Sequence, residues 1–196
     1  MHLTVTREDY FEAALELLAT KGATSLKIAP LCKGLRITTG SFYGYFGSFD
    51  GFVAELLAHW ELLHSARISE VRPGETASDD RRRLLKDLTA QVPFRAEVSM
   101  RAWAHTNQRV AEAQRRIDRL RTEALAAALR PQVGSDEDAD RLAVIGMTIF
   151  IGLQQWRSHS QQTYFDALFD EYELLVARRV AARLAEDDDS GLGRPA

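Results

Sequence analysis

One short segment of the chain combines small hydroxyl side chains, aromatic rings and glycines: residues 38–46, with the sequence TTGSFYGYF. Hydroxyl groups can hydrogen-bond the phosphate oxygens or base edges of DNA, and a threonine methyl can contact a thymine methyl. The segment has three such groups, on Thr38, Thr39 and Ser41. Gly40 and Gly44 weaken the interior of a helix, so we expect them to let another backbone, of protein or of DNA, come close. These residue types favour recognition of a nucleic acid.

The aromatic side chains of this segment divide between two sides of a predicted helix. Phe42 and Phe46 are four residues apart, which places both on one face, and we expect that face to be buried. Tyr43 and Tyr45 then project outward, where their hydroxyl groups can reach phosphates.

The charge around the segment supports the same interpretation. The whole chain has a formal net charge of -3, which at face value argues against a nucleic-acid partner. Residues 20–49, however, contain no aspartate or glutamate. They do contain four cations that could neutralise phosphates: Lys21, Lys27, Lys33 and Arg36. On charge alone, the alternative to a nucleic-acid interface is a basic face of a helical domain that contacts only solvent.

A first helix is predicted to begin at Thr6 and to support this basic segment. Asp9 stands three residues after Thr6, which suggests a capping box. Gly22 is the predicted end of this helix, because glycine readily adopts the conformation that terminates one.

Two further short helices complete a predicted head. The second begins at Thr24 or Ser25 and runs through Cys32, and a turn over residues 34–37 leads to the third, at about 38–46. Two short helices with a tight connection are typical of a helix-turn-helix, although that spacing alone occurs in many other proteins.

The rest of the chain is also predicted to be helical, which makes the fold all-α with about nine helices. Ser48 is the expected N-cap of a long helix that ends at about Val71. A loop follows over residues 72–80, and Pro93 and Pro131 mark two later breaks. The remaining helices are expected at about 80–91, 93–105, 107–130, 136–158 and 162–185, followed by a disordered acidic tail at 186–196.

Over about residues 10–60 the chain resembles the TetR family of bacterial transcriptional regulators. The likeness rests on KGATS at 21–25, on IAPLC at 28–32 and on TTGSFYGYF at 38–46, with a long helix after them. The resemblance implies that Tyr43 contacts phosphate and that Phe46 packs the head. Together with the cations, it yields a predicted DNA-binding set: Lys27, Arg36, Thr38, Thr39, Gly40, Ser41, Tyr43 and Tyr45.

Some residues depart from the pattern of that family. The family usually has glycine where Arg36 stands, and Pro30 falls inside the second helix, where proline is uncommon unless the helix starts late. The third helix has no positive side chain. We therefore expect phosphate binding to depend on the four flanking cations.

The resemblance also implies a division into a helix-turn-helix DNA-binding domain at 1–46 and an effector-binding and dimerisation domain at 47–185. The helix at 136–158 is apolar nearly all round in its middle, so both its faces should be buried, and Gly146 and Gly152 would allow close helix packing. A homodimer through 136–158 and 162–185 satisfies this pattern. An ordinary intramolecular core is the alternative.

Large apolar side chains with a few polar groups describe a pocket for a small-molecule effector, although they describe a core equally well. The candidates in the body are Trp60, His64, Met100, Trp103, Met147, Phe150 and Trp156. Effector binding is expected to shift the equilibrium between DNA-competent and incompetent dimers.

These observations predict a homodimeric repressor that binds double-stranded DNA at a palindromic operator and leaves it when a small-molecule ligand binds. A helical ligand-binding dimer that has lost specific DNA reading is the alternative, and a small-molecule enzyme is a third hypothesis. No acid–base pair, cofactor motif or phosphate loop supports an enzyme.

Other chemistries are not expected from the residues. His59 and His64 are five apart and do not share a helix face, so we expect no metal site there. The single cysteine, Cys32, excludes an internal disulfide and is expected in the core rather than as a redox sensor. No signal peptide or membrane span is recognisable, which predicts a cytoplasmic location.

Overall fold

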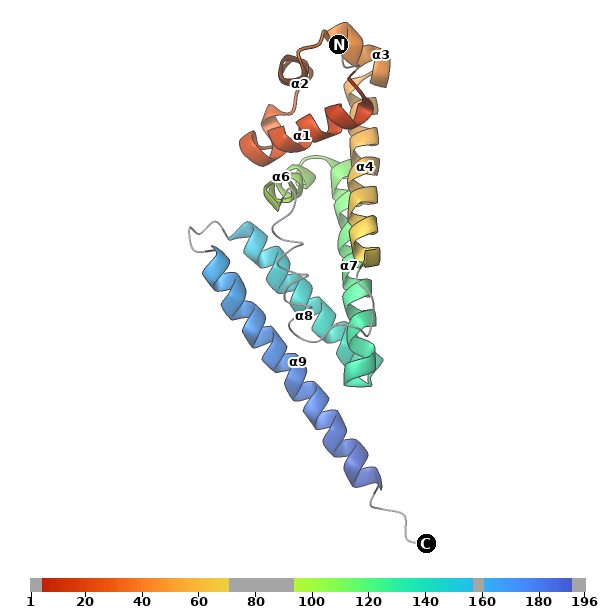
Figure 1. Ribbon diagram of the computed structural model, residues 1–196, viewed down its shortest axis with the longest axis vertical. Coiled ribbons are helices and arrows are strands. Elements are labelled where there is room, and N and C mark those ends of the chain that lie inside the picture. The colour runs from red at the N-terminus through yellow and green to blue at the C-terminus, as the bar shows by residue number, and fades with distance from the viewer. Residues whose placement is uncertain (1–4, 71–93, 157–160, 192–196) are drawn as a thin grey trace. The chain divides into compact units, whose positions relative to one another are not determined.

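The computed structural model describes residues 5–70, 94–156 and 161–191 (Figure 1). These residues form eight α-helices and one short 3₁₀ helix and contain no strand, which confirms the all-α prediction. None of the described helices is both long and apolar enough to cross a membrane. The loop expected at 72–80 and the helix expected at 80–91 lie outside the described residues.

Helix α1 (Arg7–Lys21) begins and ends where its sequence predicts. The hydroxyl of Thr6 accepts a hydrogen bond from the Asp9 backbone N–H at 3.3 Å, and the Asp9 carboxylate accepts one from the Thr6 N–H at 2.6 Å. This is the predicted capping box. Gly22 ends the helix at φ 79°, a conformation that favours glycine.

Helix α2 (Ile28–Leu35) starts later than predicted. Residues 23–25 form the separate 3₁₀ helix (Ala23–Ser25), so neither Thr24 nor Ser25 caps α2, and Lys27 occupies the N-cap position without a side-chain hydrogen bond. The late start places Pro30 in the first turn, where the missing N–H has no intrahelical partner to lose. Pro30 is therefore compatible with the helix.

Helices α3 (Thr39–Phe46) and α4 (Phe49–Glu70) follow the predicted boundaries closely. The Thr38 hydroxyl caps α3 by accepting from the Ser41 N–H at 3.2 Å. Gly47, at φ 67°, ends α3. The Ser48 hydroxyl caps α4 by accepting from the Gly51 N–H at 2.9 Å, as expected.

Residues 1–67 and 86–117 form a first compact unit, in which α6 (Phe94–Ala104) packs against α1 (Figure 1). Tyr10 and Phe11 of α1, Phe42 and Phe46 of α3, and Phe52 of α4 are buried together. This confirms the inward orientation of Phe42 and Phe46. Burial of such rings is worth about 1.5–3 kcal/mol each, and the aromatic cluster fixes α3 on α1 and α4.

Residues 68–85 and 118–196 form a second compact unit, which contains the C-terminal half of α7 (Gln108–Val133), α8 (Asp136–Gln155) and α9 (Gln161–Gly191). Helices α8 and α9 pack side by side in opposite directions (Figure 1). The Tyr172 hydroxyl donates to the Leu142 carbonyl at 3.0 Å. The boundaries of the two compact units therefore do not fall after residue 46. The division into a DNA-binding domain and an effector-binding domain stays a prediction.

The predicted break at Pro131 is wrong, because α7 continues to Val133 with Pro131 inside its last turn. Arg183 of α9 donates to the carbonyls of Pro131 and Gln132 at 3.0 and 3.1 Å. These bonds satisfy helix-end carbonyls that lack intrahelical donors. Helix α9 also extends past the predicted end at 185, to Gly191.

Candidate nucleic-acid interface

One side of α3 is exposed over its whole length. Thr39, Gly40, Tyr43 and Gly44 lie on this side, and the Tyr43 side chain is 51% exposed. A Cβ atom built on Gly44 meets no described atom within 4 Å, and one built on Gly40 meets only the Thr38 hydroxyl at 3.7 Å. Among the described residues, no protein backbone makes use of the space that these glycines leave.

The hydroxyl groups at the start of α3 differ in their surroundings. Thr38 and Thr39 are exposed, and the Thr38 oxygen that caps the helix still carries a proton that it can donate. Ser41 is half-buried, and its hydroxyl lies 3.4 Å from the Tyr10 hydroxyl. Burial raises the pKa of Tyr10, so this pair is neutral at physiological pH.

The two tyrosines of α3 have different orientations. Tyr43 projects outward as predicted, whereas the outward projection predicted for Tyr45 is wrong. The Tyr45 ring is half-buried at 5.4 Å from the Tyr10 ring, and its hydroxyl donates to the Val5 carbonyl. Helical spacing could not reveal this contact, because Val5 lies forty positions earlier in the chain.

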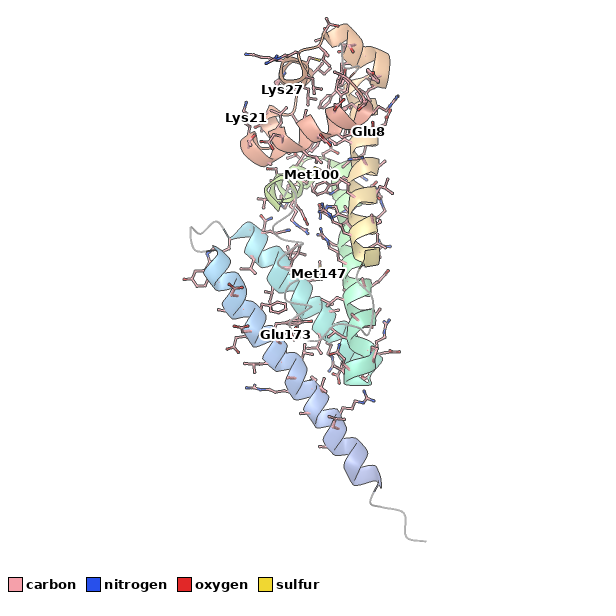
Figure 2. The ribbon with its side chains drawn as sticks, in the orientation of Figure 1. Glu8, Lys21, Lys27, Met100, Met147 and Glu173 are labelled. Atoms are coloured by element: carbon pink, nitrogen blue, oxygen red, sulfur yellow. The ribbon has the colours of Figure 1, made fainter. Side chains whose placement is uncertain are left out.

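The four cations of the segment are all exposed. Lys21 ends α1 and Lys27 precedes α2 (Figure 2), while Lys33 lies in the last turn of α2 and Arg36 follows it. Arg36 adopts a left-handed conformation, with φ 57°, at the position where the family usually has glycine. None of the four forms an ion pair with the described part of the chain. Their charges are available to an external anion.

Comparison with known proteins agrees with this arrangement. Residues 11–56, which span α2, α3 and parts of α1 and α4, match the family described as "Bacterial regulatory proteins, tetR family". This segment therefore resembles the N-terminal part of TetR-family proteins, and the match supports a DNA-binding transcriptional regulator.

Several solved structures share the fold of the chain. A TetR transcriptional regulator from Legionella pneumophila covers 91% of this chain and 98% of its own, with a TM-score of 0.70 and 14% identity. GusR of Salmonella enterica covers 92% and 100%, with a TM-score of 0.70 and 16% identity. The reduced form of NemR from Escherichia coli covers 89% and 95%, with a TM-score of 0.63 and 20% identity. No curated protein sequence matches the chain.

Four of the predicted effector-binding residues lie in the first compact unit. Trp60 and Met100 are buried in its core, and Trp103 is half-buried against them (Figure 2 labels Met100). The Trp60 ring meets His64 edge-on at 4.3 Å, and its indole N–H has no hydrogen-bond acceptor among the described residues.

The other three predicted effector residues lie in the second unit. Met147 is buried (Figure 2), and Phe150 lies under the Arg121 guanidinium at 5.2 Å. Trp156 is exposed and stacks on Tyr164 at 5.3 Å. That all seven residues serve one effector stays a prediction.

A buried polar cluster on α6 and α7 was not predicted from the sequence. Arg101 and Glu97 form an ion pair at 3.0 Å, and the Gln114 amide donates to the same Glu97 oxygen at 3.5 Å. All three side chains are buried. The i, i+4 spacing of opposite charges on α6 was the available signal, but it more often marks an exposed pair.

A polar cavity of about 530 Å³ was also not anticipated. It lies within the first unit, between the first turns of α4 and α7, and its charged lining consists of Asp50, Arg109 and Glu112. Within the described residues there is no group of three or more histidine, cysteine, aspartate or glutamate side chains that could hold a metal ion.

Proposed function

We propose that the chain is a homodimeric repressor that binds a palindromic operator through α3 and leaves it when a small-molecule ligand binds. One observation carries the DNA-binding part of this proposal. The exposed side of α3 has open glycines and exposed hydroxyl groups, and four exposed cations precede it in the chain, from the end of α1 to the end of α2. Such a surface can approach a DNA backbone closely and can neutralise phosphates. Within this proposal, the predicted DNA-binding residues other than Tyr45 serve this surface.

Tyr43→Ala tests the assignment of the reading helix. Tyr43 is exposed, so the variant should fold normally but bind the operator about tenfold more weakly, a loss of about 1.4 kcal/mol. Leu62→Ala is the control, because Leu62 is also a large exposed side chain but lies on α4, outside α3 and the proposed dimer segments. Fluorescence anisotropy with a duplex recovered by genomic footprinting measures both. Parental affinity in Tyr43→Ala would show that α3 is not the reading helix.

Exposed apolar side chains of the second unit support the proposal of a homodimer. Val144 is 56% exposed and Ile145 39% exposed on α8, and Leu174 is 52% exposed on α9. A partner on α8 and α9 would remove these apolar side chains from water, and a second copy satisfies a two-fold interface. The recognition helices of such dimers meet half-sites roughly 34 Å apart.

Val144→Glu tests the dimer, because it places a charge on the proposed interface. We expect the mass measured by light scattering to fall from that of a dimer to that of a monomer. Leu62→Glu places the same charge on an exposed apolar position of α4, outside the proposed dimer segments, and should leave the dimer intact. A monomeric parent protein would refute the homodimer directly.

The buried indole of Trp60 supports the proposal that the chain binds a small-molecule ligand. An unsatisfied buried donor costs about 1–3 kcal/mol, and Trp60 has such a donor in an otherwise well-packed core. A ligand acceptor would satisfy it. Trp60→Phe should therefore keep the DNA affinity of the parent while weakening the binding of any compound that raises the melting temperature and releases the operator. Unchanged ligand affinity in this variant would exclude Trp60 from the effector site.

A further inference from the structure

The recognition helix α3 is intrinsically weak and depends on contacts from outside itself. It has only eight residues, of which Gly40 and Gly44 each disfavour a helix by about 1 kcal/mol relative to alanine. Its last turn contains no basic residue to balance the negative end of the helix dipole. A helix of this kind needs external partners at its C-terminal end to keep one conformation.

Arg7 supplies the missing charge at that end. Its guanidinium donates from Nη2 to the Tyr45 carbonyl at 2.7 Å. The neighbouring carbonyls of Tyr43 and Phe46 already accept from Gly47 and Ser48. Arg7 therefore satisfies a helix-end carbonyl that those two turn residues leave free.

The Arg7 side chain is itself held by three further contacts. Its Nε atom donates to a Glu55 carboxylate oxygen on α4 at 2.8 Å, and its guanidinium lies 5.7 Å from the centre of the Tyr45 ring and 5.6 Å from that of Phe46. The Tyr45 hydroxyl in turn donates a hydrogen bond to the Val5 carbonyl. The segment from Val5 to Arg7 thus joins the end of α3 to α4.

The position of Arg7 on its own helix is unfavourable. It is the first residue of α1, where the helix dipole disfavours a cation, and Glu8 and Asp9 follow it in the same turn. Residues that break a local rule often serve a function elsewhere in the fold. In this chain the cation that is unfavourable at the start of α1 makes the contacts to α3 and α4 described above.

We propose that Arg7 is a positioning residue for operator recognition. It fixes the C-terminal end of α3, and so the direction in which the exposed side of α3 meets DNA, without contacting DNA itself. This inference rests on the proposed DNA-binding role of α3. It also assigns Tyr45 to the support of α3 rather than to the DNA surface.

Arg7→Gln tests the proposal by two independent measurements. Amide hydrogen exchange in the free protein should be faster in the peptide covering residues 39–47 and unchanged in α8 and α9. Operator affinity, measured by anisotropy, should fall about tenfold. The slope of log affinity against log salt should not change, because each lost phosphate contact lowers that slope by about 0.9 and Arg7 makes none in this proposal.

Three further variants keep the test decisive. Arg115→Gln removes the same charge from an exposed position on α7 and should alter neither measurement. Arg7→Lys can still donate to the Tyr45 carbonyl and should restore part of the affinity. Glu55→Gln removes only the α4 partner, so it should show a weaker form of the Arg7→Gln effect even if Arg7→Gln itself folds poorly.

Two results would overturn the inference. Unchanged exchange in α3 would show that Arg7 does not hold that helix. A salt slope reduced by about 0.9 would show that Arg7 contacts phosphate directly. A parent protein that binds no duplex would instead refute the proposed function, while the exchange measurement would still decide whether Arg7 holds α3.

Discussion

Gly146 of α8 leaves the space that the side chain of Tyr172 on α9 occupies. A Cβ atom at Gly146 would lie 3.0 Å from the Tyr172 hydroxyl oxygen, and equally close to Cδ2 of Leu125 on α7. The Tyr172 ring cannot move away without losing its hydrogen bond to the Leu142 carbonyl. The absence of one methyl group therefore allows three helices to meet in the second compact unit.

Gly146→Ala should destabilise the chain by about 1 kcal/mol, because overpacking costs about 1–3 kcal/mol and exceeds the gain in helix propensity. Gly152→Ala should stabilise α8 by about 0.5–1 kcal/mol, since nothing lies within 4 Å of its Cβ position. Thermal denaturation followed by circular dichroism compares the two. Equal shifts in melting temperature would contradict the packing described for Gly146.

Arg36→Gly should raise the stability of the head by up to about 1 kcal/mol, because a side chain at positive φ is strained. It should also weaken operator binding, because a cation beside α3 is lost. Arg36→Gln separates the two effects: it removes the charge but keeps the strain. Melting temperature and operator affinity should therefore change in opposite directions for Arg36→Gly, and only affinity should fall for Arg36→Gln.

Asp9 should make the stability of the head depend on pH. Hydrogen bonds from the backbone and the hydroxyl of Thr6 lower the pKa of Asp9 from its ordinary value of 3.8. The folded state thus favours the carboxylate, and its contribution is present above the unfolded pKa and is lost as the pH falls through the folded pKa. Asp9→Asn should lower the melting temperature at neutral pH, and the difference from the parent should shrink under acid conditions. A difference independent of pH would argue against this capping interaction.

Cys32 should resist thiol reagents in the folded chain. It is 3% exposed, and burial raises the pKa of its thiol, so little reactive thiolate forms. Labelling by a disulfide reagent should be slower by roughly 100-fold or more than in denaturant and should require local opening. Rapid labelling of the native protein would show that α2 opens far more readily than its buried contacts indicate.

The parts of the fold that depend on near neighbours in the chain could be predicted. The capping box of Thr6 and Asp9, the cap of Thr38 and the helix end at Gly22 all join groups within about four residues of each other. The inward direction of Phe42 and Phe46 follows from helical periodicity alone. The same local rules failed at Pro131. There the carbonyls of the last turn of α7 accept hydrogen bonds from Arg183, which lies on α9.

The candidate site shows the same distinction. Its exposed hydroxyl groups, its open glycines and its four cations were recognisable from residue types. The inward turn of Tyr45 was not, since it depends on the Val5 carbonyl and the Tyr10 ring. The buried group of Glu97, Arg101 and Gln114 was missed as well, because the spacing of its charges is also that of an ordinary exposed pair.

The sequence by itself determined that this chain is helical, where most of its helix ends lie, and that a basic segment free of acidic residues surrounds a short helix of hydroxyls, glycines and aromatic rings. These properties are local, because capping, periodicity and charge act over a few residues. The tertiary structure decided which tyrosine of α3 faces outward, which glycine of α8 is needed for packing, and that Arg7 holds the end of α3. Each of those outcomes depends on groups far apart in the chain that only folding brings within hydrogen-bond or van der Waals distance.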